Sequence, residues 1–205
     1  INMVYKSLLE ILVLLDRHKI EMGKSRGLSE GVIQALESNG YRSYRENWES
    51  WLVSTLSEKL STDAFYGVPG FYREDKTWRF CAPNGIVFPV KDMNGTIRAL
   101  SVRKDVPGNG KYVYVSSNSR QNGTRSWYGV HVIRNGKSFK NIWVVEGIFK
   151  ADVVAELLPG IGLILGIPSM TVGHRDLTEI IKDFPKSSVV LAIDADWRDK
   201  DTVKE

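Results

Sequence analysis

The last third of the chain alternates between short apolar runs and helical segments, and this alternation limits the fold more than any other feature. The apolar runs and the helices expected between them occupy residues 142–145, 149–158, 162–165, 176–183 and 188–193. Nearly continuous apolar strands that alternate with helices are typical of a parallel sheet covered on both faces. The sequence therefore predicts an α/β domain with a parallel sheet over residues 141–205.

Residues 1–140 have a different character and predict an α+β part, with helices followed by antiparallel hairpins. Residues 1–60 carry apolar residues at helical spacing, with Ser29 as an expected N-cap and Asn39-Gly40 as an expected helix end. The apolar stripe of the third helix is expected in the core, and it comprises Trp48, Trp51, Leu52, Leu56 and Leu60.

Asn-Gly pairs then recur between β-rich runs, which is the strongest short-range signal of a β-hairpin. These pairs begin at residues 84, 94, 109, 122 and 135, and the strands expected between them cover 86–90, 97–102 and 111–115. This part of the chain is therefore expected to be built from hairpins.

Composition narrows the class of protein. The chain has 205 residues, of which 42% are hydrophobic and 25% charged, as in an ordinary globular protein of one or two domains. It has no apolar run that could cross a bilayer and nothing like a signal peptide, so we expect a cytoplasmic protein without a membrane partner. Because a parallel sheet would normally continue beyond the last strand, we also expect a fragment of a longer protein.

Acidic residues follow two of the three expected parallel strands: Glu146 after the first, and Asp194 and Asp196 after the last. The carboxyl ends of such strands meet at one edge of the sheet, where ligands bind. With one cysteine and three scattered histidines, a metal there would need carboxylate ligands, which suit Mg²⁺ or Mn²⁺. Gly147 would let a phosphate approach the backbone. The alternative is that these carboxylates are ordinary capping or loop residues.

Basic residues in the hairpin region are candidates for contact with nucleic acid or nucleotide. Arg103, Lys104 and Lys111 lie at the ends of expected strands, and the formal net charge is +4. Phosphate contacts require such charges, although a solvated face explains them equally well. Arg198, just beyond the acidic pair, could hold a triphosphate or simply fill a loop.

Several segments resemble the toprim domain that bacterial-type DNA primases, topoisomerases and some nucleases share. They are Val-Val-Glu-Gly-Ile-Phe-Lys-Ala-Asp at 144–152, Gly-Ile-Pro-Ser at 166–169 and Val-Val-Leu-Ala-Ile-Asp-Ala-Asp at 189–196. The upstream segments 26–29, 40–41, 85–97, 101–103, 111–117 and 127–129 resemble the catalytic core of primases in particular. The resemblance is closest to primase-like toprim proteins of phages, plasmids and other mobile elements.

This resemblance implies a nucleotidyl transferase that makes a short primer on single-stranded DNA from NTPs during DNA replication, with a replicative helicase as partner. Its metal and catalytic residues would be Glu146, Asp194 and Asp196. Its nucleotide or nucleic-acid contacts would be Arg103, Lys104, Lys111, Gly147, Lys150 and Arg198. Lys150 stands where primases have an aspartate, which leaves the number of metal ions open. The alternatives are a non-catalytic nucleic-acid-binding toprim module linked to a helicase, or a toprim nuclease.

Overall fold

The computed structural model describes residues 1–108, 110–169 and 172–194. The chain divides into two compact units, the first formed by residues 1–89 with 97–127 and the second by residues 90–96 with 128–205. The domain boundary expected after residue 140 lies within the second unit. Strand β7 (His131–Asn135) precedes that boundary and belongs to the sheet of the second unit.

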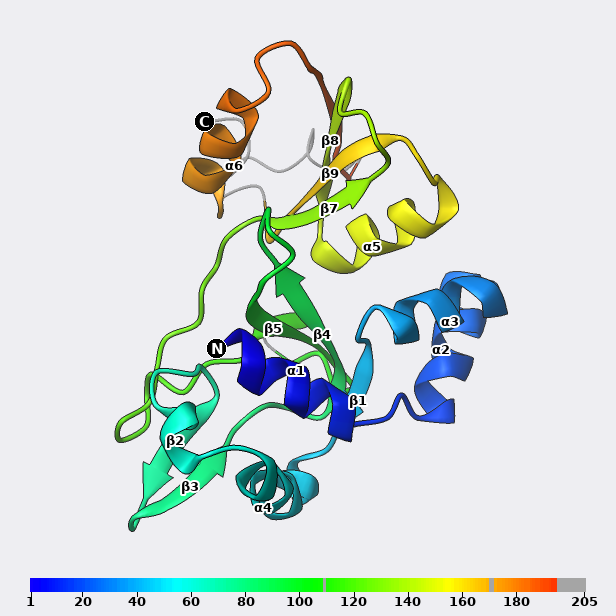
Figure 1. Cartoon of the computed structure of the whole chain (residues 1–205). Helices are drawn as coiled ribbons and strands as arrows, with labels where there is room; N and C mark the ends of the chain where they lie inside the picture. Colours follow the sequence, from blue (N-terminus) through cyan, green and yellow to red (C-terminus); the bar gives the residue numbers. More distant parts are fainter. Residues whose placement is uncertain (109, 170–171, 195–205) are drawn as a thin grey trace. The chain divides into compact units, whose positions relative to one another are not determined.

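The first unit begins with helices and continues with antiparallel strands (Figure 1). Its helices are α1 (Asn2–Ile11), α2 (Asp16–Arg26), α3 (Glu30–Ser38) and α4 (Glu49–Lys59), with the short 3-10 helices η1 (Glu46–Trp48) and η2 (Thr62–Phe65). Its strands are β1 (Arg42–Tyr44), β2 (Phe71–Glu74), β3 (Thr77–Phe80), β4 (Gly85–Lys91), β5 (Ile97–Lys104) and β6 (Tyr112–Tyr114).

Two sheets form in this part of the chain. One has four strands in the order β1-β4-β5-β6, and the other is the β2-β3 hairpin. The turn at Asn94-Gly95 joins the neighbouring strands β4 and β5, as its sequence predicted. The Asn-Gly pairs at 84 and 135 do not form hairpins, because the strands on either side of each pair bond to other partners.

Two elements of the first unit were not predicted. The β2-β3 hairpin turns at Asp75 and Lys76, whose φ angles are 47° and 68°. Both residues thus take the left-handed conformation that Asn-Gly usually supplies. Strand β1 lies within the region expected to be helical, and its Tyr44 pairs with Gly85 of β4. Three residues are too few to show a period in the sequence.

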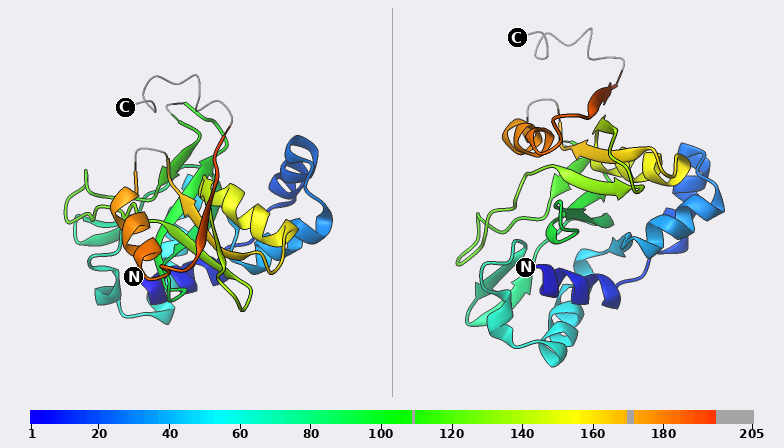
Figure 2. Two further views of the ribbon diagram at one scale, coloured as in Figure 1. Left: turned by 90° about the horizontal axis from the view of Figure 1, so that it is seen from above. Right: turned by 45° about the horizontal axis from the view of Figure 1, so that its top comes forward.

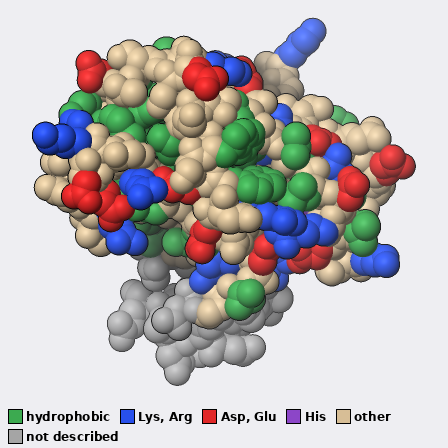
Figure 3. Space-filling view, turned by 90° about the horizontal axis from the view of Figure 1, so that it is seen from below, with side chains coloured by type: hydrophobic (Ala, Val, Ile, Leu, Met, Phe, Trp, Pro, Cys, Tyr) green, Lys and Arg blue, Asp and Glu red, His purple; other side chains and the backbone are tan. Residues whose placement is uncertain are grey.

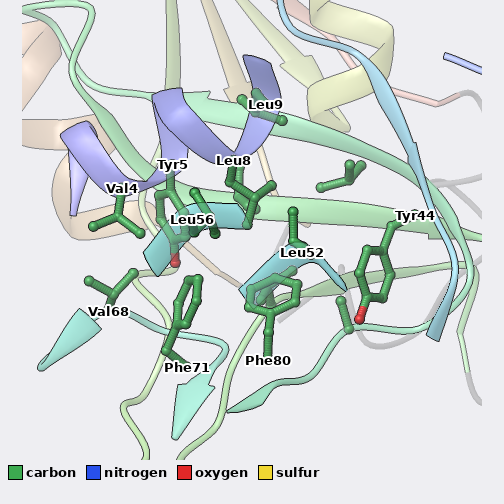
Figure 4. Packing of buried hydrophobic residues seen from close by; sticks show 14 of the residues in the cluster. Val4, Tyr5, Leu8, Leu9, Tyr44, Leu52, Leu56, Val68, Phe71 and Phe80 are labelled. Atoms are coloured by element: carbon green, nitrogen blue, oxygen red, sulfur yellow. The ribbon is translucent and has the colours of Figure 1, made fainter. Parts of the chain in front are cut away.

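The core of the first unit lies between α1, α4 and the strands. Figure 4 shows side chains from α1 and α4, such as Leu8 and Leu56, together with Phe71 and Phe80. Within the stripe predicted on α4, Leu52 and Leu56 are fully buried, whereas Trp51 is 51% exposed. The core prediction was therefore wrong for Trp51.

The helix ends predicted for α3 are confirmed. The Ser29 hydroxyl accepts a hydrogen bond from the backbone N–H of Val32 at 3.4 Å. Asn39 is the C-cap, and Gly40 follows with a φ of 104°. These local signals work because each satisfies a backbone group that the helix leaves without an internal partner.

The second unit is an α/β layer structure. Its remaining elements are β8 (Asn141–Glu146), α5 (Ile148–Leu157), β9 (Gly162–Ile167), α6 (His174–Lys182) and β10 (Ser188–Ala192). The strand order is β10-β8-β9-β7, with β8 parallel to both β9 and β10. The parallel strands are as predicted, but β7 adds an antiparallel edge and makes the sheet mixed.

Helices α5 and α6 cover opposite faces of this sheet (Figures 1 and 2). Alternate residues of a strand point to opposite faces, so Val144 packs with the α6 residues and Val145 with the α5 residues. Gly166 on β9 permits the close approach of α5, because a Cβ there would lie 2.9 Å from the Ala151 methyl group. Within the described residues, no helix is both long and apolar enough to cross a membrane.

Candidate functional site

Two acidic residues lie at one edge of the sheet in the second unit. Glu146 is the last residue of β8, and Asp194 follows β10 by two residues. The two strands are parallel neighbours, with Ala192 opposite Val145, so both chains leave the sheet at the same edge. Glu146 is half-buried and Asp194 is exposed. This edge can therefore present carboxylates to a ligand in solution.

Gly147 connects this edge to α5. Its φ is 95°, a left-handed conformation that favours glycine, and its N–H donates to the carbonyl of Ile167 at 2.9 Å. Gly147 is also the N-cap of α5 and carries no side chain that could cap the helix. Gly147 therefore turns the chain from β8 into α5 and leaves the space beside Glu146 without a side chain of its own.

Lys150 lies in the first turn of α5, and its ammonium pairs with Asp194, donating to both carboxylate oxygens. Both side chains are nearly half exposed, at 45% and 47%. The lysine that departs from the primase pattern therefore neutralises one of the two described carboxylates of the edge.

The oxygen donors of Glu146 and Asp194 suit a hard divalent ion. A metal ion that binds Asp194 must compete with the ammonium of Lys150, so these residues fit one such ion only if that ion pair opens. Among residues 1–108, 110–169 and 172–194, no group of three or more His, Cys, Asp or Glu side chains could hold a metal. The third predicted ligand, Asp196, and the predicted phosphate contact Arg198 lie outside the described residues.

A cluster of basic residues forms in the first unit where α2 meets β5 and β6. Arg103 on β5 pairs in register with Tyr112 on β6. The guanidinium of Arg26, at the end of α2, donates to the Tyr112 hydroxyl at 2.9 Å. Burial, and then the nearby charges of Arg103 and Arg26, hold the pKa of Lys111 below its usual value. The three cations therefore lie close enough to repel one another, which favours the binding of an anion.

Arg103 is not the solvated charge that the alternative interpretation assumed. It is 7% exposed, and its guanidinium forms an ion pair with Glu21 of α2. The hydrogen bond from Arg103 holds the pKa of the Glu21 carboxyl below its usual value. Lys111 is exposed and Lys104 is half-buried. Of the three predicted contacts, Lys111 is thus the most accessible to a phosphate.

Figure 3 shows basic and acidic side chains interspersed over the face that it views. No single sign of charge dominates that face, in keeping with the small net charge of +4. Electrostatic attraction to a polyanion would thus depend on local clusters such as the one around Lys111.

Sequence patterns did not single out Arg26 or Glu21 as members of the basic cluster. They lie on a helix far along the chain from Arg103, and only the fold brings the groups together. For Arg26 the only signal in the sequence was its place in the primase-like segment 26–29, and the structure places it at the end of α2, directly before the left-handed Gly27.

Two buried histidines, not assigned a role, pair with aspartates. In the second unit, His131 Nδ1 accepts from the Lys91 N–H at 2.9 Å and its Nε2 lies 3.1 Å from Asp152. The backbone donor fixes the neutral tautomer, so Nε2 carries the proton. The pair therefore ties the turn between β4 and β5 to β7 and α5.

In the first unit, His18 lies 2.7 Å from the Ser43 hydroxyl and 2.8 Å from Asp105. The set contains the residue types of a hydrolytic triad, but Ser43 is fully buried. Its hydroxyl also accepts from the N–H of Leu15 at 2.8 Å. We assign this set a structural role, because no substrate can reach the serine.

No family model matches the sequence, and no curated protein matches it. Similarity appears at the level of structure. The chain is similar to the primase of Aquifex aeolicus (zinc-binding and RNA polymerase domains), with a TM-score of 0.68 and 17% identity over 93% of this chain. It is similar to the RNA polymerase domain of the Mycobacterium tuberculosis primase DnaG, with a TM-score of 0.65 and 12% identity over 96% of the chain.

A third similar structure is the DnaG primase catalytic domain bound to single-stranded DNA, with a TM-score of 0.62 and 15% identity over 93% of this chain. The chain spans 47% of the Aquifex aeolicus structure, 67% of the Mycobacterium tuberculosis structure and 60% of the DNA-bound one. The chain therefore has the fold of DnaG-type primase catalytic domains.

Proposed function

We propose that the chain is a primase-type nucleotidyl transferase core that makes a short primer on single-stranded DNA. The observation that carries the proposal is the delivery of Glu146 and Asp194 to one edge of a parallel sheet, within a fold shared with primase catalytic domains. In this proposal residues 141–205 are a toprim domain and residues 1–140 an N-terminal primase part. The source would be a phage, plasmid or other mobile element.

Primer synthesis joins the 3′-hydroxyl of one nucleotide to the α-phosphorus of the next NTP, with loss of the hydroxyl proton and release of pyrophosphate. Glu146, Asp194 and Asp196 would hold Mg²⁺ or Mn²⁺, which supplies positive charge at the phosphates and makes the attacking hydroxyl more acidic. The open backbone at Gly147 would give the triphosphate room. Lys150 and Arg198 would pair with its oxygens.

The basic cluster of the first unit would guide the template. Lys111 and Lys104 would contact phosphates directly, while Arg103 would hold the cluster together through Glu21. Related folds that have been solved with single-stranded DNA, and with a double-stranded oligomer carrying a 6-nucleotide overhang, support this assignment. A replicative helicase as partner and a cytoplasmic location complete the proposal.

Primer synthesis on a single-stranded template with labelled NTPs and Mg²⁺ or Mn²⁺ tests this function. The wild type should give short labelled products, and Glu146→Gln should reduce them at least a hundredfold. Glu179→Gln, on α6 with its carboxylate paired to Arg175, is the matched control and should leave synthesis unchanged. Equal synthesis by wild type and Glu146→Gln would contradict the proposal. Template cleavage without NTPs would instead identify a nuclease.

The ion pair between Lys150 and Asp194 favours one alternative, a non-catalytic nucleic-acid-binding module. A lysine can balance the charge of the acidic edge without any metal. This alternative predicts binding of single-stranded DNA with no primer product under any metal condition.

A further inference from the structure

A pocket of about 510 Å³ opens in the first unit among strands β1, β2, β3 and β6. Its volume lies in the range of small-molecule sites, roughly 300–1,000 Å³. The basic cluster residues Arg26, Arg103 and Lys111 are not among its lining residues. Its aromatic lining residues are Tyr44, Tyr72, Phe80 and Tyr114. This wall is suited to a flat ring.

The hydroxyl of Tyr44 gives the pocket an unsatisfied polar group. Tyr44 is 1% exposed and lines the pocket. Figure 4 shows its ring at the edge of the core, with the oxygen pointing away from α1. This hydroxyl forms no hydrogen bond with any residue in the described part of the chain. The hydroxyl is not one of the fully buried polar atoms that lack a partner, so it reaches the pocket, where water or a ligand can pair with it.

Ion pairs link several of the charged side chains in the pocket wall. Arg79 pairs with Glu49 at 3.2 Å and with Glu74 at 3.3 Å. A carboxylate oxygen of Glu49 also accepts from the N–H of Phe80 at 3.2 Å. Arg79 thus offsets the charge of one of these two carboxylates, and Glu46 adds a third carboxylate to the lining, so this part of the wall is acidic on balance.

Arg120 is the second arginine of the lining. Its guanidinium lies over the ring of Tyr72, 5.5 Å from the ring centroid, and the residue is exposed. Within the described residues it forms no ion pair. A ligand that places a ring against the tyrosines would thus find a cation available for an attached anionic group.

We propose that this pocket binds a nucleotide unit, with the base against the tyrosine rings and the phosphate beside Arg120. The Tyr44 hydroxyl would then bond to a polar atom of the base. The tyrosine rings and Arg120 indicate an aromatic ligand whose anionic group lies on the Arg120 side of the pocket. The choice of a nucleotide among such ligands rests on the proposed function. The unit could be a free nucleotide or one nucleotide of a single strand, since both present the same base and phosphate.

Cys81 allows a direct test, because its thiol is the only one in the chain and the residue lines this pocket. Burial raises the pKa of the Cys81 thiol, so alkylation by iodoacetamide is followed at alkaline pH by mass spectrometry. The probes are the four nucleoside monophosphates and an oligothymidylate. Saturable slowing of alkylation by a monophosphate indicates a free nucleotide, and slowing by the oligomer alone indicates a strand.

Three variants show whether the ligand that protects Cys81 contacts the Tyr72 ring, Arg120 and the Tyr44 hydroxyl. Tyr72→Leu and Arg120→Gln should each weaken the affinity of the ligand that protects Cys81 by about tenfold, because each removes a stacking or phosphate contact. Tyr44→Phe keeps the ring and removes the hydroxyl, so it should weaken affinity roughly threefold to tenfold. Arg98→Gln is the matched control, since Arg98 also lies 5.5 Å over an aromatic ring, that of Trp127, outside the pocket lining.

Absence of protection by every probe would overturn the inference. Protection that is equally strong in Arg120→Gln, Tyr72→Leu and wild type would overturn it too, because the ligand would then act from elsewhere. Glu146→Gln separates the two proposals. It should abolish primer synthesis and leave the protection of Cys81 unchanged, so failure of one proposal is visible without failure of the other.

Discussion

The ammonium of Lys150 contacts both carboxylate oxygens of Asp194, so a protein cation already lies at the acidic edge of the second unit. A divalent ion and an ammonium cannot share one carboxylate without repulsion between them. In the proposed metal site, Lys150 would therefore compete with the metal ion for Asp194. The ion pair is nearly half exposed on both sides, and exposed pairs are weak, so the competition should be modest.

Lys150→Ala should raise the affinity for Mn²⁺ by roughly twofold to fivefold, the equivalent of a surface ion pair. Lys150→Asp should raise it further, because it replaces a cation with a carboxylate ligand. Isothermal titration calorimetry measures both the affinity and the number of ions bound.

Lys140→Ala is the matched control for Lys150→Ala. Lys140 is exposed and precedes the opposite, amino-terminal end of β8, so its removal changes the net charge equally. If Lys150→Ala and Lys150→Asp both bind Mn²⁺ like the wild type, Lys150 does not compete with metal.

Binding of single-stranded DNA should depend on salt through the basic cluster. Lys111→Ala should weaken binding and lower the log–log salt slope by roughly 0.7, the value for one phosphate contact on a single strand. Fluorescence anisotropy with a labelled oligonucleotide at several salt concentrations gives the slope. Lys111 is the better target than Arg103, whose loss would leave the Glu21 carboxylate without its ion-pair partner.

Lys59→Ala serves as the control for that measurement. Lys59 is an exposed residue at the end of α4, and its loss should leave the slope unchanged. Identical slopes for Lys111→Ala and wild type would place the strand on another face of the protein.

The sequence predicted the second unit better than the first. Strands β8 and β9 are largely buried apolar runs, although β10 is exposed. The strand–helix alternation is repeated over enough residues to specify both type and order. The antiparallel strand β7 (His131–Asn135) was not predicted in this sheet, because the Asn-Gly pair at 135 indicated a hairpin with β8. In the structure β7 pairs with β9 instead.

Only the part of the candidate site that lies at the ends of parallel strands could be predicted from the sequence. Glu146 and Asp194 were found because parallel neighbouring strands end at one edge. The pairing of Arg103 with Glu21 could not be predicted, because it depends on how α2 packs beside the sheet. Lys150 was expected near the acidic group, but one helical turn cannot specify which carboxylate it reaches.

Acid should destabilise the first unit through His18. Burial lowers the pKa of His18 below 6.5, against the smaller opposing effect of Asp105. In the unfolded chain the same histidine takes up a proton near pH 6.5, so between its folded pKa and pH 6.5 the unfolded state binds more protons. The free energy of unfolding therefore falls as pH falls below about 6.5.

Urea unfolding between pH 7.5 and pH 5 tests this assignment. His18→Gln should unfold with a shallower dependence on pH, whatever its stability at pH 7.5. Asp105→Asn removes a charge that favours protonated His18, so it should keep the dependence and extend it to lower pH. If His18→Gln keeps the full dependence of stability on pH, the acid destabilisation must come from other groups.

Adjacent residues of α4 should differ sharply in their contribution to stability. Leu52 is fully buried among α1, α4 and the strands, so Leu52→Ala should cost roughly 2–5 kcal/mol of unfolding free energy. Trp51 is 51% exposed, with one edge-on contact to Trp48. Because alanine also favours the helix, Trp51→Ala should cost less than about 1 kcal/mol. Urea midpoints compared at equal m-values measure both costs. Equal losses would mean that Trp51 is buried in solution.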